Sequence, residues 1–327
     1  PGAAEAVVAA CGGRALGLAL EAWGEDDAGL RARIADLAGS VPDVEIALVD
    51  RLLRDRDQGV RDAARRAWSR LKSRPRAAIS IRLLGDFAVA RDGGAVPLSA
   101  FTRTKARALL ACLVAARGPV HREALCDRLW PELPPERAAA ALRSTLYDLR
   151  RAVEPEVEAG SPESIIATDG DAVRLALTGR DRCDALDFAR LAATAGDDDL
   201  DALRAAEAAY GGPFAPEWPY DDWAAGPRAE LEETHHHLVA RLAAALVRAG
   251  RPEDAVPRYR RLLAREPERE GWHRELMRAY AAAGERALAL RQYHACRTVL
   301  RREQGIEPDP ETRALYAAVL REEPSAL

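Results

Sequence analysis

A 34-residue repeat near the C-terminus constrains the fold more than any other feature of this sequence. Residues of the same type recur at this spacing in four places: Leu242 and Leu276, Gly250 and Gly284, Ala255 and Ala289, Tyr259 and Tyr293. A period of this length indicates pairs of helices that stack and bury a continuous core. Glycine permits the tight turn inside each pair, and alanine lets helices approach closely. Tyrosine would fill the groove between pairs, so we expect both tyrosines to be buried.

The helical pattern extends over residues 181–323, and its period is that of tetratricopeptide repeats. One long loop, residues 211–227, interrupts it and carries Trp218, Tyr220 and Trp223 among acidic residues. We expect these aromatic side chains to pin the loop onto the repeats. Binding of a protein partner through them is the alternative.

Residues 1–76 are also expected to be helical. The stretches 26–40 and 56–70 align with a shift of 30 residues, and the second resembles the end of a HEAT repeat, a short turn followed by an Ala-rich helix. An ordinary helical bundle is the alternative. The chain opens without methionine inside this pattern, so we expect further sequence upstream. Residues 73–78 break the pattern and predict a linker.

Between residues 79 and 178, hydrophobic residues first occupy every second position, as in strands. They then recur with the spacing of a helix, and finally occupy every second position again. Strands, three helices and a closing hairpin are the order of elements in a DNA-reading module. We predict a hairpin at 79–93, helices at 103–118 (closed by Gly118), 121–130 and 136–153, an exposed acidic loop at 154–163, and a hairpin at 164–177.

The third helix has one apolar side and one side rich in arginine. Its apolar residues share a face and predict a core stripe: Leu142, Leu146, Leu149 and Val153. An α-helix fits the major groove, where arginine can bind guanine through two hydrogen bonds. We assign four residues to the groove, Arg143, Ser144, Tyr147 and Arg150, and assign Arg151 to a base or a phosphate. A solvated helix face is the alternative.

Residues 79–321 resemble the actinobacterial-type antibiotic regulatory proteins. The resemblance is carried by "IRLLGDFAVARDG", "TKARALLACLV", "REALCDRLWPELPPERAAAALRSTLYDLRRAV", "CDALDFARL", "YDDWAAGPRAELEE" and "GIEPDPETRALY". It implies an OmpR-like winged helix joined to a bacterial transcriptional activator domain of tetratricopeptide-like repeats. It also implies binding to double-stranded promoter DNA and recruitment of RNA polymerase.

Three features depart from the family pattern. Asp148 stands where relatives often carry a basic residue, and we expect it to face solvent and repel phosphate. The wing hairpin carries Asp169 and Asp171 at its tip, so only Arg174 is placed to contact DNA there. At the start of the first helix of this segment, Arg103 and Lys105 are expected to hold a phosphate with the help of the helix dipole.

Composition narrows the remaining possibilities. Basic and acidic residues nearly balance, at 48 against 52, so nucleic-acid affinity must come from a local patch. Five scattered cysteines and the lack of a long apolar run favour a cytoplasmic protein without a membrane segment. No phosphate-binding loop, nucleophile elbow or zinc-protease motif is present, so we expect neither an enzyme nor a cofactor.

No metal site is expected either. The histidines at 235–237 are consecutive on a helix, so their side chains point about 100° apart and cannot share one ion.

The sequence thus predicts a mainly α protein of three modules: a HEAT-like segment at 1–76, a winged helix at 79–178 and a tetratricopeptide-like domain at 181–323. Its expected function is transcription regulation, with a homodimer as one possible assembly. A protein-interaction scaffold that has lost DNA binding is the alternative.

Overall fold

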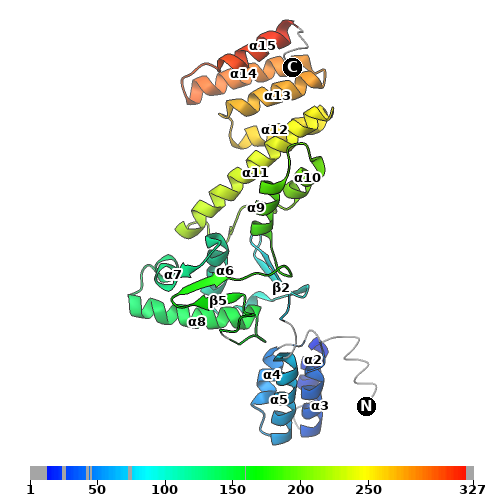
Figure 1. The fold of residues 1–327 in the computed structure, drawn as a ribbon, viewed down its shortest axis with the longest axis vertical. Helices are drawn as coiled ribbons and strands as arrows, with labels where there is room; N and C mark the ends of the chain where they lie inside the picture. Colours follow the sequence, from blue (N-terminus) through cyan, green and yellow to red (C-terminus); the bar gives the residue numbers. More distant parts are fainter. Residues whose placement is uncertain are drawn as a thin grey trace. The chain divides into compact units, whose positions relative to one another are not determined.

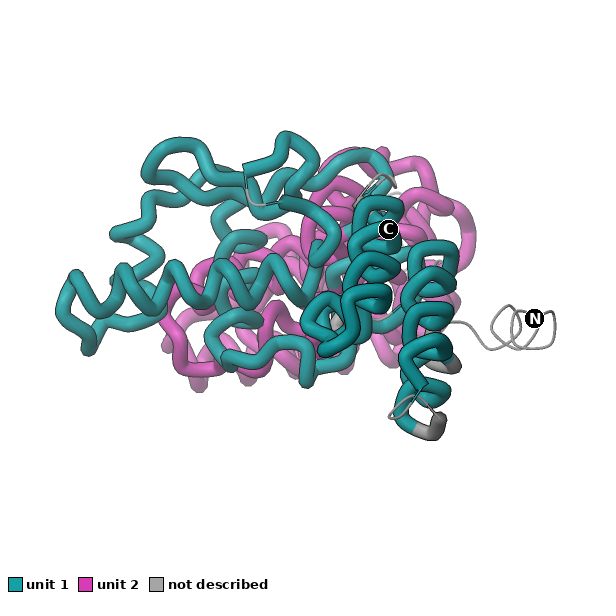
Figure 2. The backbone as a smooth tube through the Cα atoms, turned by 90° about the horizontal axis from the view of Figure 1, so that it is seen from below, with its two compact units in different colours: residues 1–81, 88–182 teal, residues 82–87, 183–327 magenta. Residues whose placement is uncertain are grey.

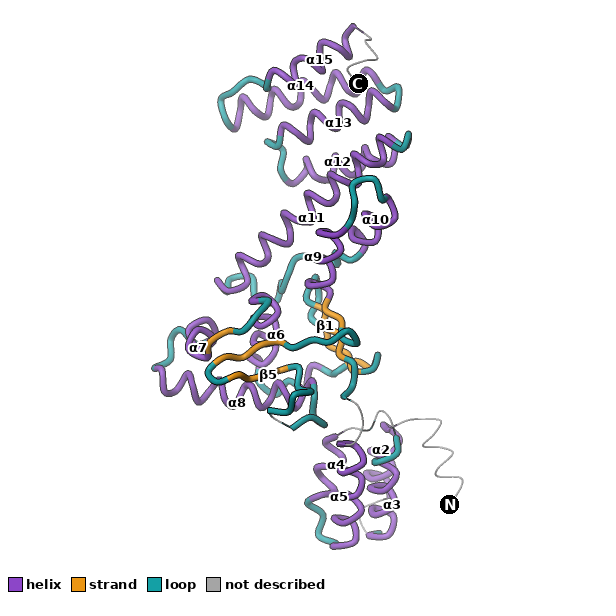
Figure 3. The backbone as a smooth tube through the Cα atoms, in the orientation of Figure 1, coloured by secondary structure: helices purple, strands orange, loops and turns teal. Residues whose placement is uncertain are grey.

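A computed structural model of the chain describes residues 13–23, 27–41, 44, 46–72, 76–158 and 160–321. These residues are mainly helical, and the strands are confined to the middle of the chain (Figures 1 and 3). The chain divides into two compact units, residues 1–81 with 88–182 and residues 82–87 with 183–327 (Figure 2). We call them unit 1 and unit 2.

The N-terminal part of unit 1 contains four described helices, α2 (Gly13–Trp23), α3 (Ala28–Ala38), α4 (Ile46–Leu53) and α5 (Gln58–Lys72). The 30-residue shift seen in the sequence has a structural counterpart. Asp27 accepts a hydrogen bond from the Leu30 amide at 3.0 Å, and Asp57 accepts one from the Val60 amide at 3.1 Å. Each carboxylate therefore satisfies an amide at the start of its helix. The relation to HEAT repeats stays a prediction.

Residues 79–183, which include the rest of unit 1, follow the predicted order of elements. These elements are β1 (Ile79–Arg82), β2 (Ala88–Arg91), β3 (Gly94–Ala95), η1 (Leu98–Ala100), α6 (Thr104–Ala116), β4 (Val120–His121), α7 (Arg122–Leu129), α8 (Pro135–Val153), β5 (Ile166–Asp169), β6 (Ala172–Leu175) and β7 (Arg182–Cys183). The strands form one sheet in the order β3-β2-β1-β7 and another in the order β4-β6-β5. Helix α8 packs against α6 and α7.

The core of this region is the predicted one, and two local predictions are wrong. All four residues of the stripe on α8 are at most 2% exposed. Helix α6, however, is closed by Arg117 in the left-handed conformation (φ 53°) and not by Gly118. The segment after α8 is also not a fully exposed acidic loop, because Glu154 is 1% exposed and Glu156 accepts a hydrogen bond from the Ala77 amide.

Unit 2 is a succession of packed helices. They are α9 (Asp184–Thr194), α10 (Leu200–Ala208), α11 (Asp222–Arg248), α12 (Pro252–Arg265), α13 (Glu270–Ala282), α14 (Arg286–Glu303) and α15 (Pro310–Arg321). From α9 onward, each helix packs against the next. Gly250 and Gly284 have φ of +71° and +77° at the two equivalent turns, a conformation that glycine adopts without strain. Tyr259 and Tyr293 are buried, at 1% and 7% exposure, which confirms the prediction that both rings lie in the core.

The aromatic loop ends earlier than predicted, because α11 begins at Asp222 and Trp223 lies in this helix. The loop is held in part as predicted. Trp218 contacts the ring of Phe87 edge-on and that of Trp223, and Arg228 donates hydrogen bonds to the carbonyl groups of Phe214, Ala215 and Trp218. Tyr220 is the exception, because 95% of its surface is exposed. It does not pin the loop.

Candidate nucleic-acid interface

The outward face of α8 carries three of the five residues predicted on this helix. Arg143, Tyr147 and Arg151 are exposed and lie four residues apart, so they share one side of the helix. Ser144 is half-buried, and its hydroxyl donates to the carbonyl of Ala140 at 3.2 Å. This hydrogen bond occupies the hydroxyl proton of Ser144, which leaves its oxygen as an acceptor.

The cations on this face differ in what already binds them. No hydrogen bond or ion pair joins Arg143 to another residue in the described ranges. Arg151 lies over the ring of Tyr147 and pairs with Asp50 of α4 at 2.6 Å. The hydrogen bonds to Asp50 and Tyr147 raise the pKa of the Arg151 guanidinium. Of the arginines predicted on this helix, Arg143 is therefore the one best placed to bind a ligand.

Arg150 lies at the edge of this face, but its side chain points toward β5. Its side chain is half-buried, and its guanidinium donates a 2.8 Å hydrogen bond to the carbonyl of Ile166 in β5. Burial is the main reason why the pKa of this guanidinium is lowered from its ordinary value. The structure thus turns Arg150 toward the wing strand and not toward the groove position that the sequence suggested.

Asp148 corrects another expectation. Its side chain is 17% exposed and forms an ion pair with Arg103, with Arg103 Nε 2.7 Å from Asp148 Oδ2. It therefore does not stand in solvent as an isolated negative charge. The pair joins α8 to the residue preceding α6, and each partner neutralises the other.

The start of α6 has the features of a phosphate site only in part. Arg103 is the residue before the first turn, and no side chain caps the helix there. The first turn contains no acidic residue, and Lys105 within it is half-buried. The positive end of the helix dipole and the lysine favour an anion at this end. Arg103 can contribute only if it leaves Asp148 or contacts both groups.

The wing has the acidic tip that the sequence predicts. Strands β5 and β6 pair antiparallel with Asp169 opposite Ala172, and Asp169 and Asp171 are both exposed. Arg174 is exposed on β6. The wing therefore offers one cation and two carboxylates to whatever lies beside it.

Arg137 on the first turns of α8 is a candidate that the sequence interpretation missed. It is exposed, and no ion pair holds it among the residues that the structure describes. The sequence interpretation did not consider Arg137 as a DNA-binding residue, because it closely follows Pro134 and Pro135, which predict a turn. Residues near the start of a recognition helix commonly contact base edges.

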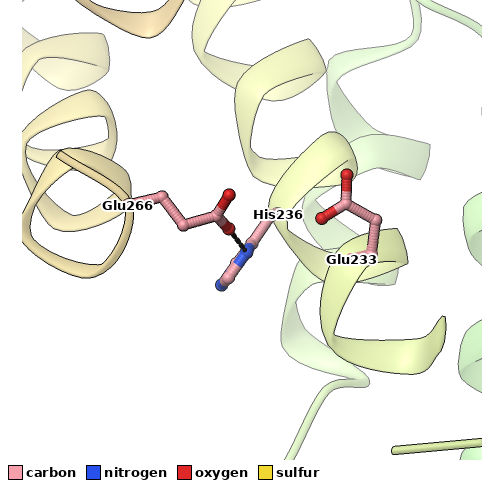
Figure 4. Close-up of side chains that lie close together, drawn as sticks. All are labelled: Glu233, His236 and Glu266. Atoms are coloured by element: carbon pink, nitrogen blue, oxygen red, sulfur yellow. Dashed lines mark hydrogen bonds and ion pairs between the residues drawn. The ribbon is translucent and has the colours of Figure 1, made fainter. Parts of the chain in front are cut away.

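A second cluster of titratable groups lies in unit 2, where Glu233 and His236 of α11 meet Glu266 at the end of α12 (Figure 4). His236 Nδ1 is 2.7 Å from Glu266 Oε1. Arg269 pairs with Glu233 at 2.8 Å and with Glu266 at 2.5 Å. Burial raises the pKa of Glu233, but the hydrogen bond from Arg269, together with the electrostatic attraction of Arg269 and of the neighbouring histidines, outweighs burial and lowers the pKa. A metal ion would have to displace this guanidinium, so we assign the cluster to packing between helices.

The three consecutive histidines have different surroundings, as the helix geometry predicts. His235 stacks on Tyr210 with ring centroids 4.0 Å apart, whereas His236 faces Glu266 and His237 pairs with Glu233.

The cysteines at 112, 126, 183 and 296 are buried free thiols. Within the described ranges, no helix is long and apolar enough to span a membrane.

Comparison with known proteins gives these features a context. Residues 181–320 match the bacterial transcriptional activator domain. The transcriptional regulatory protein MoaR1 of Mycobacterium tuberculosis is 29% identical over 76% of this chain and 81% of its own length. EmbR of Mycobacterium tuberculosis is 30% identical over 74% of this chain and 63% of that protein. The regulatory protein AfsR of Streptomyces coelicolor is 31% identical over 76% of this chain but only 25% of AfsR.

A solved structure is similar as well. Mycobacterium tuberculosis EmbR, in complex with a low-affinity phosphopeptide, matches with a TM-score of 0.63 and 27% identity, over 76% of this chain and 68% of the EmbR chain. The fold and the matches define a transcription regulator that combines a small strand-containing module with a bacterial transcriptional activator domain. These matches support its assignment to the actinobacterial-type antibiotic regulatory proteins.

Proposed function

We propose that this regulator binds double-stranded promoter DNA through the outward face of α8, acting by binding and not by catalysis. The observation that carries the proposal is Arg143, an exposed arginine without a partner among the described residues, next to the exposed Tyr147. An α-helix fits the major groove, and a free guanidinium can bind guanine O6 and N7 together. Arg137 lies on the preceding turns of the same helix and extends the interface toward its start.

Contacts to the DNA backbone would come from the two flanks of α8. Lys105 at the start of α6 is the candidate on one flank, and Arg174 on the wing is the candidate on the other. Contacts of this kind fix the register of a protein on the duplex but carry no sequence information. Arg103 and Arg151 would join them once their pairs with Asp148 and Asp50 open.

For unit 2 we propose contact with RNA polymerase or with a second copy of the chain. The support is the match of residues 181–320 to the bacterial transcriptional activator domain and the stack of helix pairs, a fold whose extended surfaces bind other proteins. Pull-down with purified RNA polymerase and sedimentation at several concentrations separate the two partners.

A binding measurement with duplex DNA tests the main proposal. Fluorescence anisotropy at several salt concentrations should show an affinity that falls as salt rises. Arg143→Ala should weaken binding by about 1–3 kcal/mol because it removes a charged contact in the groove. Arg291→Ala is a suitable control, since Arg291 is exposed on α14 of unit 2. Equal affinity of both variants and the wild type would refute the assignment of this face.

One observation favours the rival function of a scaffold without DNA binding. The exposed carboxylates of Asp169 and Asp171 form the wing tip and would repel phosphates. A wild-type chain that binds no duplex even at low salt, but still binds protein partners, would replace our proposal with this one.

A further inference from the structure

The last turns of α8 are tied to the strand that leads to the wing tip. Arg150 Nη2 donates to the carbonyl of Ile166 at 2.8 Å. The carboxylate of Glu154 accepts hydrogen bonds from the amides of Ile165 at 2.7 Å and Ile166 at 3.3 Å, and from the hydroxyl of Ser164. Because β5 is the edge strand of the order β4-β6-β5, these side chains satisfy backbone groups that no other strand pairs with in the part of the chain that the structure describes.

These contacts are shielded from water. Glu154 is 1% exposed, and Ile165 and Ile166 are fully buried. Arg150 is half-buried, and its Nε is buried without a hydrogen-bond partner in the described part of the chain. Hydrogen bonds between a charged group and the backbone are strong, and they are stronger still where water is excluded. The link between α8 and β5 is therefore stiff on both sides of Ile166.

We propose that Arg150 and Glu154 are positioning residues, which set the distance between the wing tip and the DNA-reading face of α8. The proposal rests on the proposed function, since the effect of the two residues is measured as a change in DNA affinity. Arg150 then contacts neither base nor phosphate. It acts through Ile166. Asp169 and Asp171 follow Ile166 by three and five residues, so holding Ile166 keeps both carboxylates at a fixed place beside the bound duplex.

Salt dependence separates this role from a direct phosphate contact. A lost phosphate contact lowers the slope of log affinity against log salt by about 0.9. We expect that decrease for Lys105→Met. Arg150→Met keeps the aliphatic stem, removes no phosphate contact and releases two carboxylates that repel the phosphates, so it should neither weaken binding as Lys105→Met does nor lower the slope. A decrease in slope equal to that of Lys105→Met would overturn the positioning role.

A double-mutant cycle with the wing gives a second readout. In the wild type, Asp169→Asn with Asp171→Asn should tighten binding, because two negative charges leave the vicinity of the phosphates. In the Arg150→Met background the wing is no longer held, so this gain should shrink by at least about threefold, within the usual range of coupling between linked residues. The Arg143→Ala background should preserve the full gain. Equal gains in all three backgrounds, or no gain in the wild type, would overturn the proposal.

Glu154→Gln keeps the test valid if Arg150→Met does not fold. Glu154 is buried and cannot reach DNA, so a reduced wing effect in this variant can arise only through positioning.

Hydrogen exchange without DNA reports on the link itself: peptides covering residues 164–175 should exchange faster in Arg150→Met and in Glu154→Gln, but not in Arg143→Ala. Unchanged exchange in both variants would also refute the link. A wild type that shows the exchange pattern but binds no duplex would refute the proposed function and the positioning role, while the link stands.

Discussion

Arg103 and Asp148 form an ion pair, 2.7 Å apart, between the residue preceding α6 and the middle of α8. The pair joins two residues with opposite expected effects on DNA: an arginine that would bind phosphate and an aspartate that would repel it. Since Asp148 is only 17% exposed and Arg103 is 56% exposed, the arginine is the partner that can turn toward a ligand. The pair therefore limits the phosphate affinity of the α6 end.

Asp148→Asn should tighten DNA binding by severalfold at low salt, because Arg103 becomes available to a phosphate. The slope of log affinity against log salt should rise by up to about 0.9. Anisotropy titrations at several salt concentrations measure both quantities. Asp201→Asn is the matched control, since Asp201 also pairs with an arginine but lies exposed in unit 2. Weaker binding by Asp148→Asn would mean that Arg103 needs its partner in order to be positioned.

Replacing Asp169 and Asp171 by asparagine should tighten binding, and more so at low salt. Repulsion between a wing carboxylate and a phosphate at roughly 6–8 Å costs from a few tenths to about 2 kcal/mol before screening. Affinities of the double variant at low and at physiological salt provide the measurement. An unchanged affinity at both concentrations would show that the wing stays clear of the duplex.

Tyr259→Ala should lower the free energy of unfolding by about 3 kcal/mol, the scale expected for a large buried side chain. The ring is 1% exposed, and its hydroxyl lies 3.3 Å from the carbonyl of Ala240. Tyr220→Ala, at a position 95% exposed, should change stability by less than about 0.5 kcal/mol. Urea unfolding of the full chain compares the two. Similar losses would contradict the role of Tyr259 as a filler between helix pairs.

His235 should make unit 2 sensitive to acid. Burial is the main cause that lowers the pKa of His235 to about 4, next to the stacked ring of Tyr210. In the unfolded chain an ordinary histidine has a pKa of about 6.5, so the unfolded state binds the proton first. The stability from neutral His235 is therefore complete above about pH 6.5 and is lost progressively as pH falls toward 4.

His235→Phe should remove this part of the pH dependence. The pKa of His273 is also lowered, mainly by burial, and it adds a loss of the same sign that the variant retains. Urea unfolding at pH 7 and at pH 5 for the wild type and the variant isolates the contribution of His235. An equal decrease in both proteins would show that His235 does not carry it.

Much of the fold follows from local periodicity. The repeat at 34 residues predicted the buried tyrosines and the two glycine turns, because residues that share a helix face keep their spacing whatever surrounds them. The core stripe of α8 and the wing hairpin were predicted for the same reason. The end of α6 was not, since an arginine adopted the left-handed cap beside a glycine that was available for it.

The details of the interface depend on tertiary structure. Arg143 and Arg150 are seven residues apart and differ by only about 20° around the helix, so the sequence assigns both to one face. The fold separates them, because β5 lies beside Arg150 and offers it the carbonyl of Ile166. Asp148 likewise finds Arg103, 45 residues earlier, which no local pattern connects to it. The sequence determined which residues line each helix face, and only the packing of neighbouring elements decided which charges at the edge of a face remain available to a ligand.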